Sequence, residues 1–292
     1  MLLRSLQFVP GNNLRLINSA KKSNADMLIF DLEDSVQPEN NKILARDIIK
    51  KNLKNRDFDK YLKFVRLNEI STKFFLQDVI ELAQAPIDGF LLSKTNTADD
   101  VKYLHSLLDS LEIEGKIKRQ INIIPILESA LSIVNINEIA VASDRIIALG
   151  YGSEDFVSDI QGVRDFHTNV SIDYGRKLVP IVARARGLEA IDAAYIHVHD
   201  LEKLEVHVNE GKILGYSGMW VLHPKQNEIV NRVYSPTEQE YNEAIEFLEL
   251  YEEAKRQNKG VAIVNGKFVG PPLVTKANEI IRKMELIKSK NG

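Results

Sequence analysis

The sequence predicts an α/β fold in which eight parallel strands, joined by helices, close into a (β/α)8 TIM barrel with a small C-terminal hairpin-helix appendage. Two observations carry this prediction. Eight short apolar or β-branched runs end in Gly, Pro or charged residues, and amphipathic stretches lie between most of them. The runs do not alternate strictly between apolar and polar residues, so we expect strands covered on both faces, as in a parallel sheet with right-handed helical crossovers.

Amphipathic stretches separate most of the predicted strands. The clearest helix between them runs from Thr97 to Leu111, where Thr97 and Asp100 form a capping-box pattern. The interval from Tyr151 to Ala193 is too long for one loop and one helix, so we expect an extra excursion above the barrel. The eight strands are expected at Ser5–Val9, Met27–Phe30, Lys63–Leu67, Gly89–Ser93, Ile121–Leu127, Arg145–Gly150, Ala194–His199 and Met219–Leu222.

The C-terminal region predicts a last barrel helix and then a separate appendage. Ser235 to Glu238 have the pattern of a helix N-terminus, with Ser235 as the N-cap, and Tyr241, Ala244, Ile245 and Leu248 share one face of the helix that follows. Beyond it, Asn265-Gly266 between two apolar runs is typical of a two-residue hairpin turn, and Pro272 to Ile287 is helical in pattern. We therefore assign residues 1–258 to a catalytic barrel domain and residues 259–292 to the appendage.

Composition excludes several classes of protein. Lys and Arg total 38 against 41 Asp and Glu, a net charge of −3, so we expect no nucleic-acid partner. Without cysteine there is no disulfide, thiolate nucleophile, iron–sulfur cluster or Cys-based zinc site. No apolar run approaches the roughly 20 residues that cross a bilayer, and the start is too short in apolar residues for a secretory signal. We expect a soluble cytoplasmic protein without a membrane partner.

Sequence motifs for three common enzyme classes are also missing. We find no Ser-His-Asp spacing, no P-loop and no Gly-x-Gly-x-x-Gly after a strand. Nucleophilic hydrolases, nucleoside triphosphatases and dinucleotide enzymes are therefore disfavoured.

Charged residues gather at the ends of the predicted strands, where the active sites of such barrels lie. Five carboxylates and two cations are expected on one rim. Pro10 and Gly11 follow the first strand, Asp31, Glu33 and Asp34 the second, Arg66 the third, Lys94 the fourth, Glu128 the fifth, Asp155 the sixth, and His223 and Pro224 the eighth.

Such a group of carboxylates predicts a divalent metal ion. Like charges held close together in a partly desolvated site raise one another's pKa and destabilise the fold, and a hard cation relieves that repulsion. Oxygen ligands without cysteine favour Mg²⁺, with Mn²⁺ as the alternative. We predict Glu128 and Asp155 as the ligands, because they follow neighbouring strands. Gly150 and Gly152 are expected to let the backbone approach a ligand closely.

Each of these residues also has a structural alternative. Glu128 and Asp155 could cap the helices that follow them, and Asp34 could be a cap or an arginine partner. Arg66 could form a buried structural ion pair. The histidines also have structural interpretations. His223 could be a strand-end residue whose ring is hydrogen-bonded within the protein. His197 and His199 alternate along a predicted strand, and we expect them to pack in the core or to contact solvent.

Six segments, in this order, resemble the citrate lyase beta subunit family within the wider HpcH/HpaI aldolase group. Together the resemblance spans about residues 4 to 284. The segments are Phe8-Val9-Pro10-Gly11, Asp31-Leu32-Glu33-Asp34-Ser35-Val36, Val65-Arg66-Leu67-Asn68, Ile124-Pro125-Ile126-Leu127-Glu128-Ser129, Gly152-Ser153-Glu154-Asp155 and His223-Pro224-Lys225-Gln226.

The resemblance implies a Mg²⁺-dependent carbon–carbon lyase. Its substrates would be 3-hydroxyacyl thioesters, of citryl, malyl, citramalyl or methylmalyl type, carried on coenzyme A or an acyl carrier protein and cleaved to a keto acid and an acyl thioester. It implies the metal on Glu128 and Asp155 and the substrate carboxylate or oxyanion on Arg66. The remaining roles are supporting acids at Asp31, Glu33 and Asp34, with Arg66, Glu33 and Asp34 counted as catalytic, and substrate binding by Pro10, Gly11, Asp31, Lys94, His223 and Pro224.

One position departs from the family pattern. Acyl-CoA lyases of this family typically carry an Asp in the segment after the hairpin, and this Asp reaches a neighbouring subunit's site as acid/base. Here the segment from Gly266 to Pro272 has Gly270 at that position. Two alternatives therefore stay open: an accessory protein that binds the thioester with weak or no turnover, and a free-acid pyruvate aldolase. The segment still implies a homo-oligomer, with a trimer favoured.

Overall fold

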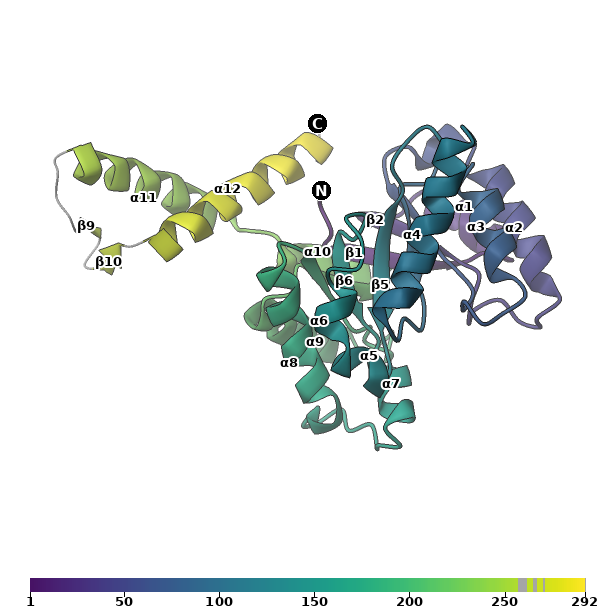
Figure 1. The fold of residues 1–292 in the computed structure, drawn as a ribbon. Coiled ribbons are helices and arrows are strands. Elements are labelled where there is room, and N and C mark those ends of the chain that lie inside the picture. Colours follow the sequence, from purple (N-terminus) through teal and green to yellow (C-terminus); the bar gives the residue numbers. More distant parts are fainter. Residues whose placement is uncertain (257–261, 265–266, 270, 292) are drawn as a thin grey trace. The chain divides into compact units, whose positions relative to one another are not determined.

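The computed structural model describes residues 1–256, 262–264, 267–269 and 271–291 of the chain (Figure 1). Contacts divide it into two compact units, one from Leu3 to Asn231 and one made of Met1, Leu2 and the chain from Arg232 onward. Within the described residues, no helix combines the length and the apolar character needed to cross a bilayer.

The unit from Leu3 to Asn231 is a closed barrel of eight parallel strands in sequence order, which confirms the predicted fold class. Strand β1 closes the barrel, since Leu6 pairs with Met27 of β2 on one side and with Trp220 of β8 on the other. The strands are β1 (Ser5–Pro10), β2 (Met27–Asp31), β3 (Leu62–Arg66), β4 (Gly89–Leu92), β5 (Asn122–Leu127), β6 (Ala148–Tyr151), β7 (Glu189–Asp192) and β8 (Gly218–Val221).

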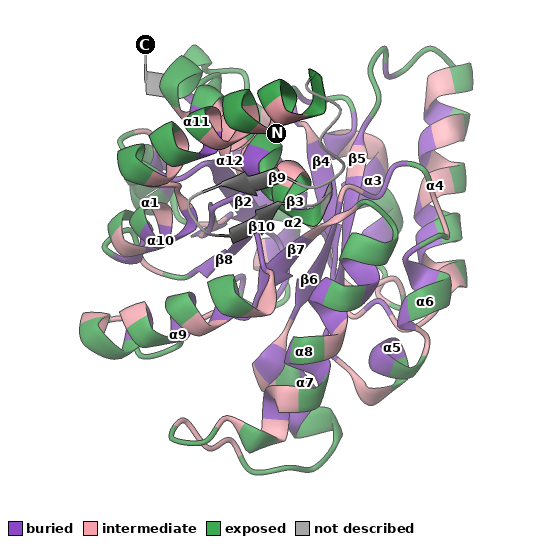
Figure 2. Ribbon diagram, turned by 90° about the vertical axis from the view of Figure 1, so that its left-hand side faces the viewer, coloured by how far each residue is buried: buried purple, intermediate pink, exposed green. Residues whose placement is uncertain are grey.

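Helices connect successive strands and present their outer faces to solvent, whereas the strands are buried (Figure 2). The predicted capping box is present in α4, where the side chain of Asp100 accepts the N–H of Thr97 at 2.8 Å. The helices that begin in this unit are α1 (Leu14–Ala20), α2 (Asn41–Asn52), α3 (Phe75–Leu82), α4 (Ala98–Ile113), α5 (Ala130–Val134), α6 (Ile136–Ile139), α7 (Ser153–Asp159), α8 (Val170–Ala185), α9 (Leu201–Leu214) and α10 (Gln226–Tyr234), with a 3-10 turn at Arg56–Phe58.

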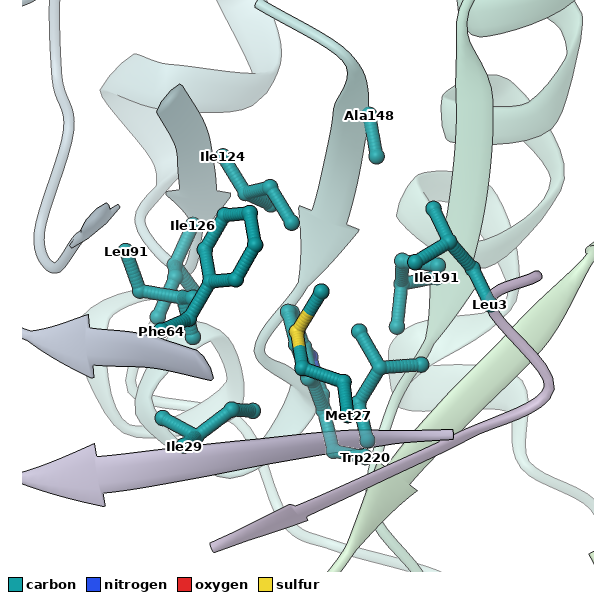
Figure 3. Close-up of a cluster of buried hydrophobic side chains, with 11 residues drawn as sticks. Leu3, Met27, Ile29, Phe64, Leu91, Ile124, Ile126, Ala148, Ile191 and Trp220 are labelled. Atoms are coloured by element: carbon teal, nitrogen blue, oxygen red, sulfur yellow. The ribbon is translucent and has the colours of Figure 1, made fainter. Parts of the chain in front are cut away.

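Apolar side chains from different strands fill the barrel interior, as Figure 3 shows. Phe64 of β3 and Met27 of β2 are fully buried, and Trp220 of β8 is 3% exposed. The indole N–H of Trp220 donates to the carbonyl of Tyr151 at 3.0 Å, so the one polar atom of this large side chain is satisfied. This packed interior gives the strand ends a rigid frame.

The seventh strand lies five residues earlier than the sequence pattern predicted. We expected Ala194–His199, but β7 is Glu189–Asp192 and residues 194–199 form no strand. Because β7 begins and ends with an acidic residue, it does not stand out as an apolar run. Asp192 is tolerated inside because the guanidinium of Arg176 binds both of its oxygens, with Nη2 at 2.7 Å from Oδ2. His197 and His199 therefore do not alternate along a strand.

The predicted excursion between the sixth and seventh strands is present. Helix α7 and the much longer α8 both lie between β6 and β7, with residues 160–169 joining them. The helix directly after β8 is α10, which we did not predict, and it separates β8 from the helix that we expected to close the barrel.

The second unit contains α11 (Glu238–Arg256), β9 (Ala262–Val264), β10 (Lys267–Val269) and α12 (Pro271–Asn291). Strands β9 and β10 pair antiparallel, as predicted for the hairpin, while its turn lies outside the described residues, as does Gly270. Helix α11 begins later than expected, because Thr237 and Glu240 form the reciprocal cap that we assigned to Ser235 and Glu238.

Helix α11 is grouped with the C-terminal elements. The ammonium of Lys288 on α12 lies 3.4 Å from a carboxylate oxygen of Glu238 and 4.3 Å from the ring centroid of Tyr241. The predicted domain boundary between residues 258 and 259 stays a prediction, whereas the compact units divide between Asn231 and Arg232.

Candidate active site at the carboxyl ends of the strands

A cavity of about 400 Å³ lies at the carboxyl ends of the barrel strands. Pro10, Asp31 and Arg66, which line it, are the last residues of β1, β2 and β3, and Glu128 directly follows β5. The full lining is Phe8, Pro10, Asp31, Asp34, Ser35, Arg66, Ile126, Glu128, Gly152, Ser153, Glu154, Asp155, Ala194, Ile196, Trp220 and Leu222. The cavity therefore joins four of the five predicted acids, Asp31, Asp34, Glu128 and Asp155, to an apolar wall.

Arg66 lies among three carboxylates. Its Nε and Nη2 donate to the two oxygens of Asp31, both at 2.7 Å, in a bidentate pair. Its Nη1 lies 2.9 Å from Glu33 Oε2 and 3.1 Å from Asp34 Oδ2. Four contacts thus occupy a guanidinium that has five N–H groups. The arginine-partner alternative for Asp34 and the ion-pair alternative for Arg66 both hold in the structure.

The Arg66–Asp31 pair is held in its charged form. Burial raises the pKa of Asp31, but the charge and hydrogen bonds of Arg66 more than offset this effect, so the pKa lies below its usual value. Burial lowers the pKa of Arg66, and the charges of Asp31, Glu33 and Asp34 reverse this shift. The guanidinium face also lies 4.8 Å from the ring centroid of Phe8, which fixes its plane.

Asp31 also organises the turn that follows β2. Its carboxylate accepts the N–H of Glu33 at 2.9 Å and the N–H of Ser35 at 3.1 Å. The hydroxyl of Ser35 donates to the same carboxylate at 2.5 Å. One side chain therefore sets both the guanidinium of Arg66 and the backbone that carries Glu33 and Asp34.

Glu33 and Lys94 are not among the residues that line the cavity. Lys94 Nζ is 3.4 Å from Glu33 Oε1 and 3.8 Å from Glu69 Oε2. Burial raises the pKa of Glu33 to about 7, although Arg66 acts in the opposite direction. Burial lowers the pKa of Lys94, but the charges of Glu33 and Glu69 outweigh this effect, so the pKa lies above its usual value. The substrate-binding role that we predicted for Lys94 stays a prediction, and its ammonium contacts protein carboxylates.

The backbone of Lys94 positions Glu128. Its N–H donates to Glu128 Oε1 at 2.6 Å, and its φ of 47° lies in the left-handed region. Glu128 does not cap the next helix, because Ser129 does so for α5. Burial raises the pKa of Glu128 to about 8, and the charge of Asp155 acts in the same direction.

Gly152 leaves the space that Glu128 occupies. A Cβ at this position would lie 2.6 Å from the Cβ of Glu128 and 2.7 Å from its Oε2. Gly150 similarly makes room for Trp220, whose ring would lie 2.1 Å from an added Cβ. Both glycines thus accommodate protein side chains, which explains a pattern that we had interpreted as room for a ligand.

Glu128 and Asp155 fit a hard divalent ion. Asp155 lies in the first turn of α7 and lines the same cavity, and burial, followed by the charge of Asp34, raises its pKa. Two carboxylates with raised pKa values favour an added positive charge between them. Among the described residues, no cluster of three His, Cys, Asp or Glu is placed to hold a metal. Mg²⁺ fits this set, since it keeps several waters and takes one or two carboxylates.

Three other predicted residues lie outside the cavity lining. The N–H of Gly11 donates to the carbonyl of Asp31 at 2.9 Å, so it supports the end of β2. The backbone N–H of His223 donates to Gln226, and its ring centroid lies 5.7 Å from that of His199. Burial lowers the pKa of His223, and the charge of His199 adds to this effect. Roles for Gly11, His223 and Pro224 at a thioester stay predictions.

The sequence did not predict the apolar side of the cavity. Trp220, Ile196 and Leu222 come from β8 and the loops that follow β7 and β8. The single Trp of the chain, on a short strand directly before a charged loop, is the signal that could have identified this wall. Glu154 also lines the cavity and pairs with Arg164 at 3.0 Å.

The fold and the cavity define a (β/α)8 barrel with a cavity lined by several acidic residues at its carboxyl-terminal rim. Comparison with known proteins agrees with this class. The family described as HpcH/HpaI aldolase/citrate lyase matches residues 4–224, and the chain belongs to this family.

Similar proteins extend over nearly the whole chain. "Citrate lyase subunit beta" from Leuconostoc mesenteroides subsp. cremoris is 34% identical over 282 residues, covering 96% of this chain and 93% of the relative. "(3S)-malyl-CoA thioesterase" from Cereibacter sphaeroides is 31% identical over 284 residues, 97% of this chain and 95% of the relative. A structure of citrate lyase beta subunit from M. tuberculosis complexed with oxaloacetate and magnesium is 25% identical, with TM-score 0.67 over 81% of this chain and 100% of that one.

Proposed function

We propose that this chain is a Mg²⁺-dependent carbon–carbon lyase that cleaves a 3-hydroxyacyl thioester to a keto acid and an acyl thioester. One observation carries the proposal: Glu128 and Asp155 line one cavity together with Arg66. Family membership and the 34% identical citrate lyase subunit support the same reaction class. The magnesium and oxaloacetate named for the similar structure support the metal and a keto acid.

Glu128 and Asp155 are the residues that would hold Mg²⁺. When bound, the ion supplies positive charge to the carboxylate and the hydroxyl or keto oxygen of the acid half. The N–H of Lys94 keeps Glu128 Oε1 in place at 2.6 Å, so Glu128 is oriented before any ligand arrives.

Arg66 would stabilise the negative charge on substrate oxygen. Asp31 holds its guanidinium from one edge, and Arg66 lines the cavity in which the substrate would bind. Phe8, Trp220 and Ile196 give the cavity an apolar side, and electrostatic contacts are stronger beside apolar groups than in bulk water. Replacing one preorganised donor of this kind costs on the order of 10²–10³ in rate.

Cleavage requires one proton to move between the two halves of the substrate. The hydroxyl on C3 loses its proton, the C2–C3 bond breaks to give the keto group and a thioester enolate, and C2 takes up a proton. Asp34 lines the cavity, and its side chain is 59% exposed, so we assign this transfer to Asp34. Gly270 stands where the family pattern has an acidic residue, and Gly270 lies outside the described residues.

Product analysis tests the proposal. The purified protein with Mg²⁺ is incubated with malyl-CoA, citramalyl-CoA and citryl thioesters, and keto acid and free thiol are measured separately. We expect keto acid without free thiol. Saturable binding without release of either product would favour the accessory protein, and pyruvate enolisation without coenzyme A would favour the free-acid aldolase.

Thioester hydrolysis is a second candidate, because a relative 31% identical over 97% of the chain is named a malyl-CoA thioesterase. In that case free thiol and the hydroxy acid would appear, and no keto acid. The same assay therefore separates the two activities.

The carrier, the assembly and the location belong to the same proposal. We propose a coenzyme A or acyl-carrier-protein thioester as partner, a homo-oligomer with a trimer favoured, and a cytoplasmic location. Light scattering of the purified protein measures its oligomeric state. A monomer at micromolar concentration would contradict the proposed homo-oligomer.

A further inference from the structure

A buried lysine outside the cavity holds the turn that surrounds Arg66. Lys42 lies on the inward face of α2 and is only 9% exposed. Its ammonium donates to the carbonyl of Leu32 at 3.1 Å, to the carbonyl of Glu33 at 3.0 Å and to Asn68 Oδ1 at 2.5 Å. These three acceptors match the three hydrogens of an ammonium group.

The two carbonyls belong to the turn between β2 and α2 that carries Glu33 and Asp34 to Arg66. Asp31 fixes this turn through the N–H groups of Glu33 and Ser35. Lys42 fixes it through carbonyl oxygens, so both kinds of backbone group in the turn are held by side chains. Without the ammonium, the carbonyl of Leu32 would lose this donor and the carbonyl of Glu33 would keep only the N–H of Val36 at 3.3 Å, and a buried acceptor left without a donor is costly.

The third acceptor of Lys42 is itself held in one orientation. Asn68 Nδ2 donates to Asp78 Oδ2 at 2.6 Å, so Oδ1 is the atom that faces Lys42. Arg46, one turn further along α2, donates from Nε to Asp78 Oδ1 at 2.7 Å. This network ties α2, α3 and the end of β3 to one another and leaves Lys42 little freedom.

Lys42 differs from an ordinary buried cation in its partners. Among the described residues, no carboxylate lies within 4 Å of its ammonium, and its acceptors are neutral oxygens. Buried lysines are rare unless paired, because desolvation of the charge is expensive. A function in positioning the turn would explain a buried lysine at this place.

We propose that Lys42 is a positioning residue for the keto-acid subsite. It fixes the turn that sets Glu33 and Asp34 on Nη1 of Arg66, and so fixes the guanidinium that meets the substrate, without touching the substrate itself. The proposal rests on the proposed function in one respect, the assignment of the substrate oxygen to Arg66. It predicts that loss of Lys42 weakens keto-acid binding while Mg²⁺ binding at Glu128 and Asp155 is unchanged.

The test compares Lys42→Met with Lys50→Met. Lys50 lies on the same helix and pairs with Glu81 at 3.4 Å, away from the turn, so it is a matched control. We expect Lys42→Met to raise the Kd for pyruvate or oxaloacetate on the order of 10- to 100-fold, by analogy with the loss of a residue that orients a metal ligand. The Kd for Mg²⁺ should match that of the wild type, as should both constants in Lys50→Met.

Amide hydrogen exchange gives a readout that needs neither substrate nor metal. In Lys42→Met the amides of Glu33, Ser35 and Val36 should exchange at least tenfold faster, while those of the barrel strands should not change. If Lys42→Met does not fold, Lys42→Ala refolded with n-propylamine, which replaces the side chain beyond Cβ, should recover both keto-acid binding and amide protection.

Two results would overturn the proposal. One is a folded Lys42→Met protein with wild-type keto-acid affinity and wild-type exchange in the turn, even if its stability is reduced. The other is loss of binding in Lys42→Ala that n-propylamine does not restore. If the wild type itself bound no keto acid, the proposed function would fail, and the exchange experiment would still decide the role of Lys42.

Discussion

Replacing Glu128 with glutamine should stabilise the metal-free protein while abolishing its response to Mg²⁺. Burial raises the pKa of this carboxyl group from 4.5 to about 8, so the folded chain disfavours its ionised form. At pH 7.5, three units above the ordinary value, this costs about 4 kcal/mol of unfolding free energy, since each unit is worth about 1.4 kcal/mol. Glutamine carries no charge, and its oxygen can still accept the N–H of Lys94 that Oε1 accepts at 2.6 Å.

The sign of the pH dependence follows from the raised pKa. Below about pH 4.5 both folded and unfolded chains carry a protonated Glu128, and the substitution changes little. As the pH rises from 4.5 to 8, only the unfolded chain releases the proton, so the wild type loses stability relative to Glu128→Gln. The stability difference between the two proteins should therefore be small at pH 5 and largest near pH 8.

Urea unfolding in EDTA at pH 5, 6.5 and 8, repeated with Mg²⁺, measures both effects. Mg²⁺ at 100 times its Kd should stabilise the wild type by about 2.7 kcal/mol and leave Glu128→Gln unchanged. Glu154→Gln is the control, because Glu154 lines the same cavity but pairs with Arg164. The reasoning is refuted if Glu128→Gln is no more stable than the wild type in EDTA at pH 8, or if Mg²⁺ stabilises both proteins equally.

Three further substitutions probe the same rim. Gly152→Ala should weaken Mg²⁺ binding at least about tenfold by calorimetry, because the new Cβ would lie 2.7 Å from Glu128 Oε2; unchanged affinity would contradict the fit of Glu128 against this glycine. Lys94→Gly should be more stable than Lys94→Ala by roughly 1 kcal/mol in urea, because residue 94 has φ 47° and only glycine adopts it without strain. Arg66→Lys should lower kcat/KM for thioester cleavage by about 10² or more, because one ammonium cannot reproduce the bidentate contacts with Asp31 at 2.7 Å; near wild-type activity would exclude a directed role for the guanidinium.

Hydrophobic patterning predicted the barrel, because most strands are buried on both faces and read as apolar runs. Strand β7 was not predicted, because it begins with Glu189 and ends with Asp192. Asp192 can be buried because it forms an ion pair with Arg176, which is distant in the sequence. The residues after β7 alternate like a strand, yet the barrel register ends at Asp192. Local pattern cannot reveal a buried charge whose partner lies on another helix.

The strand-end rule located the site but not the partnerships within it. It brought Arg66, Glu128 and Asp155 to one rim, and all three line the cavity. It could not show that Lys94 acts on Glu128 through its backbone N–H, because this depends on a single φ angle. Lys42 was missed for a similar reason, since a lysine within a polar helical segment gives no sign that it is buried.

The contacts also change the argument for a metal ion. From the sequence alone, five carboxylates on one rim predict a divalent cation. In the structure, Asp31, Glu33 and Asp34 are met by Arg66 and Lys94, so most of the repulsion among these acids is relieved by the protein itself.

Glu128 and Asp155 are different, because neither forms an ion pair among the described residues and the pKa of each is raised. Of the five rim carboxylates, only these two lack a protein cation close by within the described residues, and one divalent ion would balance their combined charge of about −2 when both are ionised. A second metal ion at Asp31 would have to displace Arg66 from a bidentate pair at 2.7 Å. These contacts support the proposal of a single Mg²⁺ on Glu128 and Asp155, in which Arg66 would be a separate cation for the substrate.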